Sequence, residues 1–306
     1  MSKARRFHRD VDGILLLDKP LGLSSNAALQ QARVLYAAKK AGHAGSLDPL
    51  ASGLLPICFG QATKVCGRLL NAGKTYQVEV QLGARTESLD GETEVIERAP
   101  VPALDEAKVD AVLASFLGPQ EQVPPMHSAL KHQGQRLYEL ARRGESIERL
   151  PRQIFIHRIE RVRLQPQRLE LVVRCSKGTY IRTLAADIAQ RLGTLGYLVD
   201  LRRLSIDPFE AHSMFTFAQL ESAREAGTLD TLLLTADVAF MDLAAVHLGA
   251  PAERALLLGQ AVDADSPVAQ GSLRAYGPTG RFLGLVEAGP AGRVHPVRLF
   301  VGGGDG

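Results

Sequence analysis

Apolar and polar residues alternate most clearly in the segment 74–82, where Tyr76, Val78, Val80 and Leu82 share one face of an extended chain. This period of two predicts a half-buried strand. Further strands are predicted over residues 13–17, 153–164 and 168–175. Apolar spacing and capping residues predict helices over residues 24–39, 105–116, 135–143, 180–192 and 215–225. Because several strands follow one another directly, we expect an α+β fold with a mixed or antiparallel sheet flanked by helices.

Three stretches depart from these patterns. Residues 42–60 hold four glycines and two prolines without a clear period, which predicts a functional loop. Residues 83–103 are acidic and contain prolines, so we expect a loop or an insertion there. Residues 247–306 place short apolar runs between Gly and Pro, which predicts a small, separate β-rich domain. The expected organisation is a basic arm over 1–12, a main domain over 13–245 and this C-terminal domain.

The composition favours a soluble globular protein over a membrane-spanning or a disulfide-rich one. The chain has 306 residues, of which 45% are hydrophobic and 23% charged, as is usual for a soluble globular protein. No apolar run approaches the ~20 residues that cross a bilayer. The three cysteines form no C-x-x-C pair, which speaks against a disulfide framework and favours a reducing, cytoplasmic compartment.

The charge is distributed unevenly along the chain. Residues 131–182 contain 13 basic and 5 acidic residues, whereas the net charge of the whole chain is only +3. A basic segment in a nearly neutral chain is typical of a nucleic-acid groove. A solvated surface crossed by salt bridges is the alternative.

Signatures of common cofactors are missing. Gly73-Lys74-Thr75 resembles the end of a phosphate-binding loop, but Arg68 stands where that loop needs glycine. The eight histidines show no metal-ligand spacing, so we expect no metal cofactor.

The segment 42–53 carries the residues best suited to chemistry. Pro49 biases Asp48 toward an extended conformation, and the neighbouring glycines let the backbone approach a flat ligand. The segment would thus present one carboxylate at a fixed angle. One alternative is a structural turn capped by Asp48. Another is a hydrolytic triad of His43, Ser46 and Asp48, although the nucleophile elbow of such enzymes is missing.

Five stretches, taken in order, resemble one known family. Residues 42–53, GHAGSLDPLASG, are similar to the G-H-x-G-x-L-D-P-x-A-x-G signature of the TruB family of tRNA pseudouridine synthases. The other stretches that resemble family motifs are GILLLDKPLGLSS at 13–25, KTY at 74–76, PMHSALK at 125–131 with the block 134–143, and SKGTYIRTL at 176–184. The resemblance covers about residues 12–240. Ala44, Ser46 and His127 depart from residues that are frequent in the family, and we expect none of them to touch the catalytic candidates.

The resemblance implies that the protein converts uridine 55 in the T-loop of tRNA into pseudouridine. The glycosidic bond breaks, the base turns over, and its C5 bonds to the ribose C1′, without a cofactor. Asp48 would be the catalytic carboxylate, which attacks C1′ or C6 or assists removal of a ribose proton. Arg182 would pair with Asp48. Tyr76 would stack on the target base and help remove the C5 proton.

The resemblance also implies which residues hold the base. The target base must leave its stack inside the tRNA. Tyr180 and Leu201 would line its pocket, and Lys19 and Pro20 would shape the floor. His43 would occupy the vacated space or pack near the flipped base.

The resemblance also implies that the basic segment 127–152 binds RNA. Arg142, Arg143, Arg149 and Arg152 would approach the phosphates of the T-stem, which positions the RNA without reading its sequence. The C-terminal region resembles the PUA RNA-binding domain of the family. We expect a monomer. The alternative function is an RNA-binding chaperone of tRNA folding, for which modification is secondary.

Overall fold

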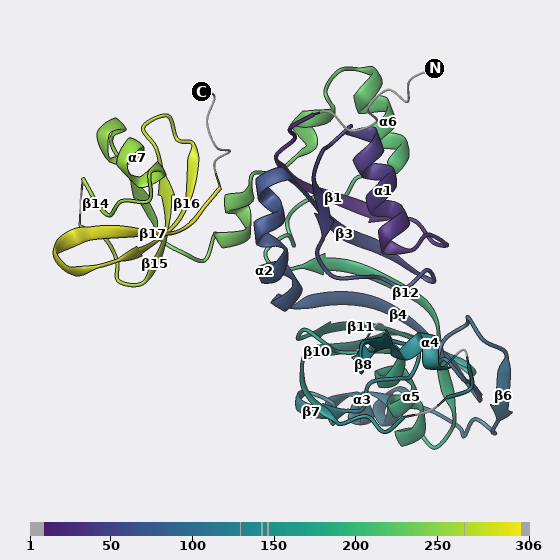
Figure 1. The fold of residues 1–306 in the computed structure, drawn as a ribbon. Coiled ribbons are helices and arrows are strands. Elements are labelled where there is room, and N and C mark those ends of the chain that lie inside the picture. The colour runs from purple at the N-terminus through teal and green to yellow at the C-terminus, as the bar shows by residue number, and fades with distance from the viewer. Residues whose placement is uncertain (1–8, 129, 142, 146, 266, 301–306) are drawn as a thin grey trace.

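The computed structural model describes residues 9–300, except 129, 142, 146 and 266. Its main sheet has the strand order β1-β3-β12-β4-β11-β10-β7, and β2 also pairs with β3 (Figure 1). These strands are β1 (Gly13–Lys19), β2 (Ala41–His43), β3 (Ala51–Phe59), β4 (Lys74–Leu82), β7 (Gly118–Gln122), β10 (Arg152–Gln165), β11 (Arg168–Cys175) and β12 (Gly196–Ile206). β12 runs parallel to β3 and antiparallel to β4. The sheet is therefore mixed, and the predicted α+β class is confirmed.

Helices and short hairpins complete the main part of the chain. The helices are α1 (Ser25–Leu35), α2 (Cys66–Asn71), α3 (Glu106–Ala114), α4 (Leu137–Ala141), α5 (Ile181–Arg191) and α6 (Phe217–Glu225). The 3-10 helices are η1 (Gly60–Val65), η2 (Leu229–Leu232) and η3 (Ala236–Phe240). The hairpins pair β5 (Ala84–Thr86) with β6 (Val95–Arg98) and β8 (Lys131–His132) with β9 (Gln135–Arg136). Serine and aspartate side chains cap α1 and α3 at Ser24 and Asp105.

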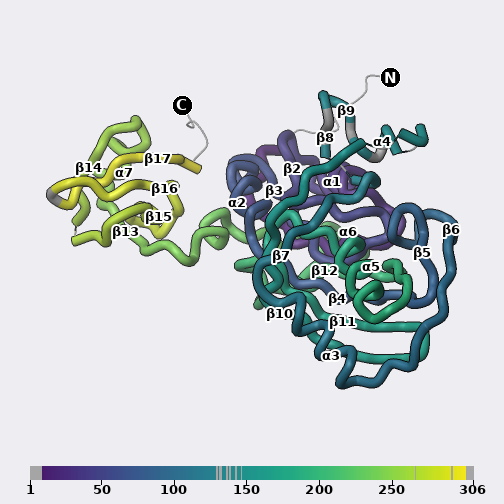
Figure 2. Tube along the Cα trace, turned by 90° about the horizontal axis from the view of Figure 1, so that it is seen from below, coloured from purple at the N-terminus to yellow at the C-terminus, as the bar shows by residue number. Residues whose placement is uncertain are grey.

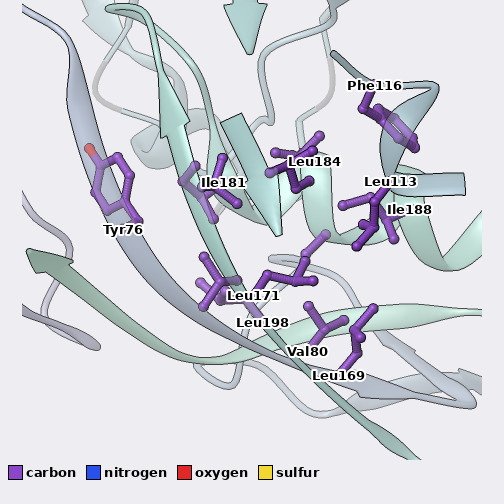
Figure 3. Close-up of a cluster of buried hydrophobic side chains, with 14 of the residues drawn as sticks. Tyr76, Val80, Leu113, Phe116, Leu169, Leu171, Ile181, Leu184, Ile188 and Leu198 are labelled. Atoms are coloured by element: carbon purple, nitrogen blue, oxygen red, sulfur yellow. The ribbon is translucent and has the colours of Figure 1, made fainter. Parts of the chain in front are cut away.

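The core is divided into layers on the two halves of the sheet. One layer packs α3 and α5 against β4, β10, β11 and β12. Figure 3 shows Leu113 of α3 and Leu184 and Ile188 of α5 facing Val80 and Leu169 of the sheet. A second layer packs α1 and α6 against β1 and β3. Each fully buried Leu or Ile stabilises the fold by about 1.5–3 kcal/mol, so these layers hold the strands beside the candidate site firmly in place.

Several sequence predictions need correction. Residues 42–60 are not one long loop, because β3 occupies Ala51–Phe59. This strand is central and covered on both faces, so its residues are apolar without alternation. The predicted helix from 24 to 39 ends at Leu35. The acidic segment 83–103, for which we expect a loop or an insertion, contains the β5–β6 hairpin, and this does not contradict the expectation.

The C-terminal part of the chain forms a second sheet with the order β13-β15-β16-β17-β14. Its elements are β13 (Ala245–His247), α7 (Ala250–Leu257), β14 (Val262–Asp263), β15 (Ser272–Tyr276), β16 (Phe282–Ala288), η4 (Pro290–Gly292) and β17 (Arg293–Leu299). Phe282 and Phe300 pack on Phe240 of η3, and the Lys64 ammonium donates to the Leu299 carbonyl at 2.6 Å. The second sheet therefore rests on the main part through an apolar contact. None of the described helices combines the length and hydropathy needed to span a membrane.

Candidate active site

The loop between β2 and β3 is held by hydrogen bonds on both sides of Asp48. The Ser25 hydroxyl donates to the Leu47 carbonyl at 2.9 Å and accepts from the Leu47 amide at 2.7 Å. The Ala51 amide donates to the Asp48 carbonyl at 3.0 Å. The Asp48 side chain itself remains 51% exposed. The loop therefore presents one accessible carboxylate on a fixed backbone.

Arg182 connects Asp48 to a second, buried carboxylate. Its Nη2 lies 3.3 Å from Asp48 Oδ2, and its Nη1 lies 2.8 Å from Asp90 Oδ2. The other Asp90 oxygen accepts from the Ser88 hydroxyl at 2.5 Å and from the Glu92 amide at 3.0 Å. The side chains of Arg182 and Asp90 are 6% and 2% exposed. Asp90 thus anchors the guanidinium from inside the protein, and Asp48 meets its outer nitrogen.

Two backbone carbonyls complete the surroundings of Arg182. Its Nη1 donates to the Ser88 carbonyl at 3.2 Å and its Nη2 to the His127 carbonyl at 2.6 Å. The expectation that His127 touches none of the catalytic candidates is therefore wrong. The contact goes through the main chain, so the type of side chain at this position could not reveal it.

Tyr76 and Leu201 lie in the core layer beside the Asp48 loop. Both are buried in the same cluster as Leu47, and Figure 3 shows the Tyr76 hydroxyl pointing away from the aliphatic side chains. Burial raises the pKa of the Tyr76 phenol, the cation of Arg203 opposes this, and the charge of Asp48 adds to it. The phenol is consequently neutral at physiological pH, with Asp48 close enough to affect it.

Arg203 supports this arrangement from the neighbouring strand. Its side chain is buried, with Nε donating to the Leu54 carbonyl at 2.6 Å and Nη2 to the Gly45 carbonyl at 2.9 Å. Gly45 has a φ of +88°, a conformation that side chains other than glycine adopt only with strain. Arg203 opposes Tyr76 in the β12–β4 register. The guanidinium therefore links the start of the Asp48 loop to β3, while the Arg203 main chain lies beside Tyr76 of β4.

Two lysines are buried around the same loop. The Lys19 ammonium donates to the carbonyls of Pro20 at 2.9 Å and Leu23 at 2.6 Å. Burial lowers the pKa of Lys19 to about 8, and the charge of Asp48 acts in the opposite direction. Pro20 itself is exposed. Lys74 donates to three carbonyls at the end of α2, and burial lowers its pKa to about 8 as well.

The depressed pKa of Lys74 predicts how stability depends on pH. Above its ordinary pKa of 10.5, the Lys74 amine is neutral in both the folded and the unfolded protein. Below about pH 8 it is charged in both, and burial of this charge then lowers the free energy of unfolding by its full amount. Between these values the unfolded chain binds more protons, so the free energy of unfolding rises with pH. We expect Lys74→Met to reduce this rise by on the order of 1 kcal/mol. Urea unfolding from pH 7.5 to 10.5 measures it, and identical pH slopes for the two proteins would contradict the assignment.

His43 and Tyr180, two further residues predicted for the site, lie at the end of β2 and at the start of α5. Burial lowers the pKa of His43, and Arg203 lowers it further, so the imidazole is neutral. Its Nδ1 is buried without a hydrogen-bond partner in the described part of the chain, and no bond to Ser46 supports a hydrolytic triad there. Tyr180 precedes α5, where its amide and carbonyl both bond to the Gln122 side chain, at 2.7 and 3.1 Å.

Comparison with known proteins identifies the family. Residues 33–181 match the N-terminal domain of the TruB family of pseudouridylate synthases. Residues 182–241 and 244–300 match C-terminal domains described for the tRNA pseudouridylate synthase B and pseudouridine synthase II TruB proteins. The chain belongs to the TruB family. It is therefore an enzyme of the isomerase class.

Relatives resemble the chain over nearly their whole length. A protein of Chromohalobacter salexigens named tRNA pseudouridine synthase B is 50% identical, over 97% of this chain and 96% of its own. A protein of Nitrosococcus oceani with the same name is 48% identical, over 98% of each chain. Both similarities include the Asp48 loop and the C-terminal sheet.

Solved structures show the same fold. A crystal structure of a Cbf5-Nop10-Gar1 complex aligns with a TM-score of 0.70 at 24% identity, over 94% of this chain and 85% of the other. An H/ACA RNP bound to a substrate RNA containing 2′-deoxyuridine aligns with a TM-score of 0.69 at 22% identity, over 95% of this chain and 85% of the other. The fold of the TruB chain is thus shared with chains of these two complexes, although their sequences are much less similar.

The predicted phosphate-contacting arginines differ in their surroundings. Arg142 lies outside the described residues. Arg143 is exposed and bonds to Glu145 at 2.7 Å and to Gln135 at 2.9 Å. Arg152 lies over the Tyr180 ring, with its guanidinium carbon 5.7 Å from the ring centre. Arg152 therefore lies beside Tyr180, one of the residues predicted to line the base pocket.

Asp90 is not among the site residues predicted from the sequence. This residue lies in the acidic segment 83–103, where one carboxylate among several has no distinguishing pattern. Its neighbour Leu89 accepts a hydrogen bond from the Leu198 amide at 3.0 Å, which carries the segment to the edge of β12. This long-range contact helps to bring Asp90 to Arg182. Among the described residues, no cluster of three His, Cys, Asp or Glu side chains could hold a metal ion.

Proposed function

We propose that this TruB protein converts a uridine in the T-loop of tRNA, at position 55, into pseudouridine, with Asp48 as the catalytic carboxylate. The observation that carries the proposal is the pairing of an exposed Asp48 carboxylate with a buried Arg182 at 3.3 Å. The names of the relatives at 50% and 48% identity support tRNA as the substrate.

The arrangement suits a reaction in which a carboxylate must stay ionised and oriented. The guanidinium of Arg182 pairs with the Asp48 carboxylate and orients it, and Asp90 fixes the guanidinium. Asp48 attacks the ribose C1′ or the base C6, or assists removal of a ribose proton. The bond between N1 and C1′ then breaks, the base turns, and C5 bonds to C1′. The proton on C5 is lost and N1 gains one, so the product is an isomer of the substrate.

The described surroundings of Asp48 suit a flipped base. A base inside the T-loop must leave its stack, at a cost of a few kcal/mol. Tyr76 and Leu201 supply an aromatic and an aliphatic surface next to the loop, and neutral His43 supplies a second ring. The raised pKa of Tyr76 keeps its phenol protonated, so we assign this ring to stacking on the base rather than to a phenolate base.

The tRNA partner would extend over the surface beyond the site. The β8–β9 hairpin and α4 stand away from the main sheet in Figure 2, within the basic segment 127–152. The guanidinium groups of Arg143 and Arg152 suit contacts with phosphates, which position RNA without reading sequence. The second sheet, which rests on η3, would add a further RNA-binding surface, and a monomer suffices for this arrangement.

The reaction is tested by release of tritium from a tRNA transcript labelled at uridine C5. We expect about one tritium per tRNA, because C5 loses its hydrogen once per isomerisation. A transcript with cytidine at position 55 should release none at that position. Tight binding of the unmodified transcript without any release would contradict the proposed function and favour an RNA chaperone.

The stacking role of Tyr76 predicts different results for two substitutions. Tyr76→Leu removes the ring, and we expect a loss of roughly 1–3 kcal/mol in transition-state stabilisation. Tyr76→Phe keeps the ring and should bind tRNA as the native protein does, with a smaller loss of rate. Single-turnover rates with saturating enzyme measure both. Equal rates for the Phe and Leu variants would show that the hydroxyl, and not the ring, matters.

A further inference from the structure

Cys58 and Cys66 lie next to each other beside Gly42 of β2, the strand that precedes the Asp48 loop. Cys58 of β3 is opposite Gly42 of β2 in the strand register, and opposed residues have Cα atoms about 4.5–5.5 Å apart. Cys66 Sγ lies 3.7 Å from the position that a β-carbon on Gly42 would take. Each of the two thiols affects the pKa of the other. They therefore share a space that the missing side chain of Gly42 leaves open.

The two thiols differ in reactivity. Cys58 is fully buried, and its interaction with the Cys66 thiol, together with burial, raises its pKa. Cys66 is partly exposed, and its interaction with the Cys58 thiol lowers its pKa despite opposing burial, with help from the positive charge of Lys40. A thiolate is the reactive form of cysteine. Cys66 is thus the nucleophile of the pair, and Cys58 is the thiol placed to react with it afterwards.

We propose that Cys58 and Cys66 form an oxidisable dithiol that a peroxide converts reversibly into an intramolecular disulfide. The Cys66 thiolate attacks one oxygen of hydrogen peroxide, the O–O bond breaks, and the departing hydroxide takes up a proton to become water. Cys58 then attacks the sulfenic sulfur of Cys66 and loses its proton, and the hydroxyl group leaves as a second water. Two thiols and one peroxide give one disulfide and two waters, and a dithiol reductant restores the pair.

The positions of lysine and arginine let trypsin separate the three cysteines into different peptides, so a disulfide between Cys58 and Cys66 can be detected directly. After limited hydrogen peroxide treatment and its removal, the protein is denatured in N-ethylmaleimide and cleaved with trypsin without reductant. Trypsin places Cys58 in peptide 41–64, Cys66 in 65–68 and Cys175 in 175–177. We expect a linked species of 41–64 with 65–68, two hydrogens lighter than the sum of the two peptides. Dithiothreitol before alkylation should abolish it, while Cys175 stays alkylated throughout.

Two variants separate the roles of the thiols. Cys66→Ser should leave Cys58 reduced at the same peroxide concentration. Cys58→Ser should accumulate sulfenic acid at Cys66, which dimedone traps, and circular dichroism checks that both variants fold. Oxidation of native Cys66 to sulfinic acid without the linked peptides would overturn the proposal. Full alkylation of both thiols at peroxide concentrations that oxidise an exposed cysteine peptide would overturn it as well.

Discussion

Replacement of Asp48 by Asn is expected to slow pseudouridine formation by more than about a thousandfold, while binding of tRNA persists. Asparagine has nearly the same shape, and its amide can still face Arg182. It lacks the negative charge that a nucleophile or a base needs in each of the possible roles of Asp48. Tritium release under single-turnover conditions measures the rate, and filter binding measures the affinity.

Ser46→Ala is the matched control for Asp48→Asn, because it changes the same loop two residues away. We expect this variant to keep a rate within about threefold of the native protein, since none of the described contacts in the site goes through the Ser46 hydroxyl. A strong loss with Ser46→Ala would revive the hydrolytic triad. A rate for Asp48→Asn above one tenth of the native rate would exclude Asp48 as the catalytic carboxylate.

Replacement of Arg182 by Met is expected to lower the free energy of unfolding by about 3–5 kcal/mol, because it leaves a buried carboxylate without its partner. Asp90 is 2% exposed and lies 2.8 Å from the lost guanidinium. Activity should fall along with stability, because Asp48 loses its cation. Urea unfolding at pH 7, together with tritium release at a temperature where the variant is folded, measures both effects.

The double variant Arg182→Met with Asp90→Asn separates stability from catalysis. It removes both buried charges, so we expect it to recover most of the lost stability. It should not recover activity, because Asp48 still lacks its partner. Recovery of activity together with stability would show that Arg182 acts only through the fold. An unchanged stability in the Arg182→Met single variant would show that Asp90 is not held by this ion pair.

Much of the fold follows from local patterns. The strand over 74–82 was predicted at its observed bounds, because it has one buried and one polar face and so alternates cleanly. β3 was missed for the opposite reason, because it lies between β1, β2 and β12 and is apolar on both faces except at Ser52. Its Gly53 also reads as a loop residue, although it is required there because a β-carbon would lie 2.2 Å from the Arg203 carbonyl oxygen.

Some residues of the candidate site were likewise predicted from the sequence, whereas others were recognised only in the structure. The pairing of Asp48 with Arg182 was expected from the family resemblance, and the structure places the two charges 3.3 Å apart. Asp90 and the His127 carbonyl were not expected, although both bond directly to Arg182. Asp90 lies outside the five motif stretches, and the contact of His127 goes through its main chain rather than its side chain.

The sequence by itself determined the strands with a single buried face, the capped helices, the family and the residue types that carry the chemistry. These depend on local periodicity, on capping and on motifs that are contiguous in the chain. The tertiary structure decided which charges meet, which of them are buried, and which thiols become neighbours. Asp90 and Arg182 come together although 92 residues separate them along the chain, and Cys58 meets Gly42 through the pairing of β3 with β2. The energy of a charge or the reactivity of a thiol depends on that burial and on those neighbours, and a local pattern contains neither.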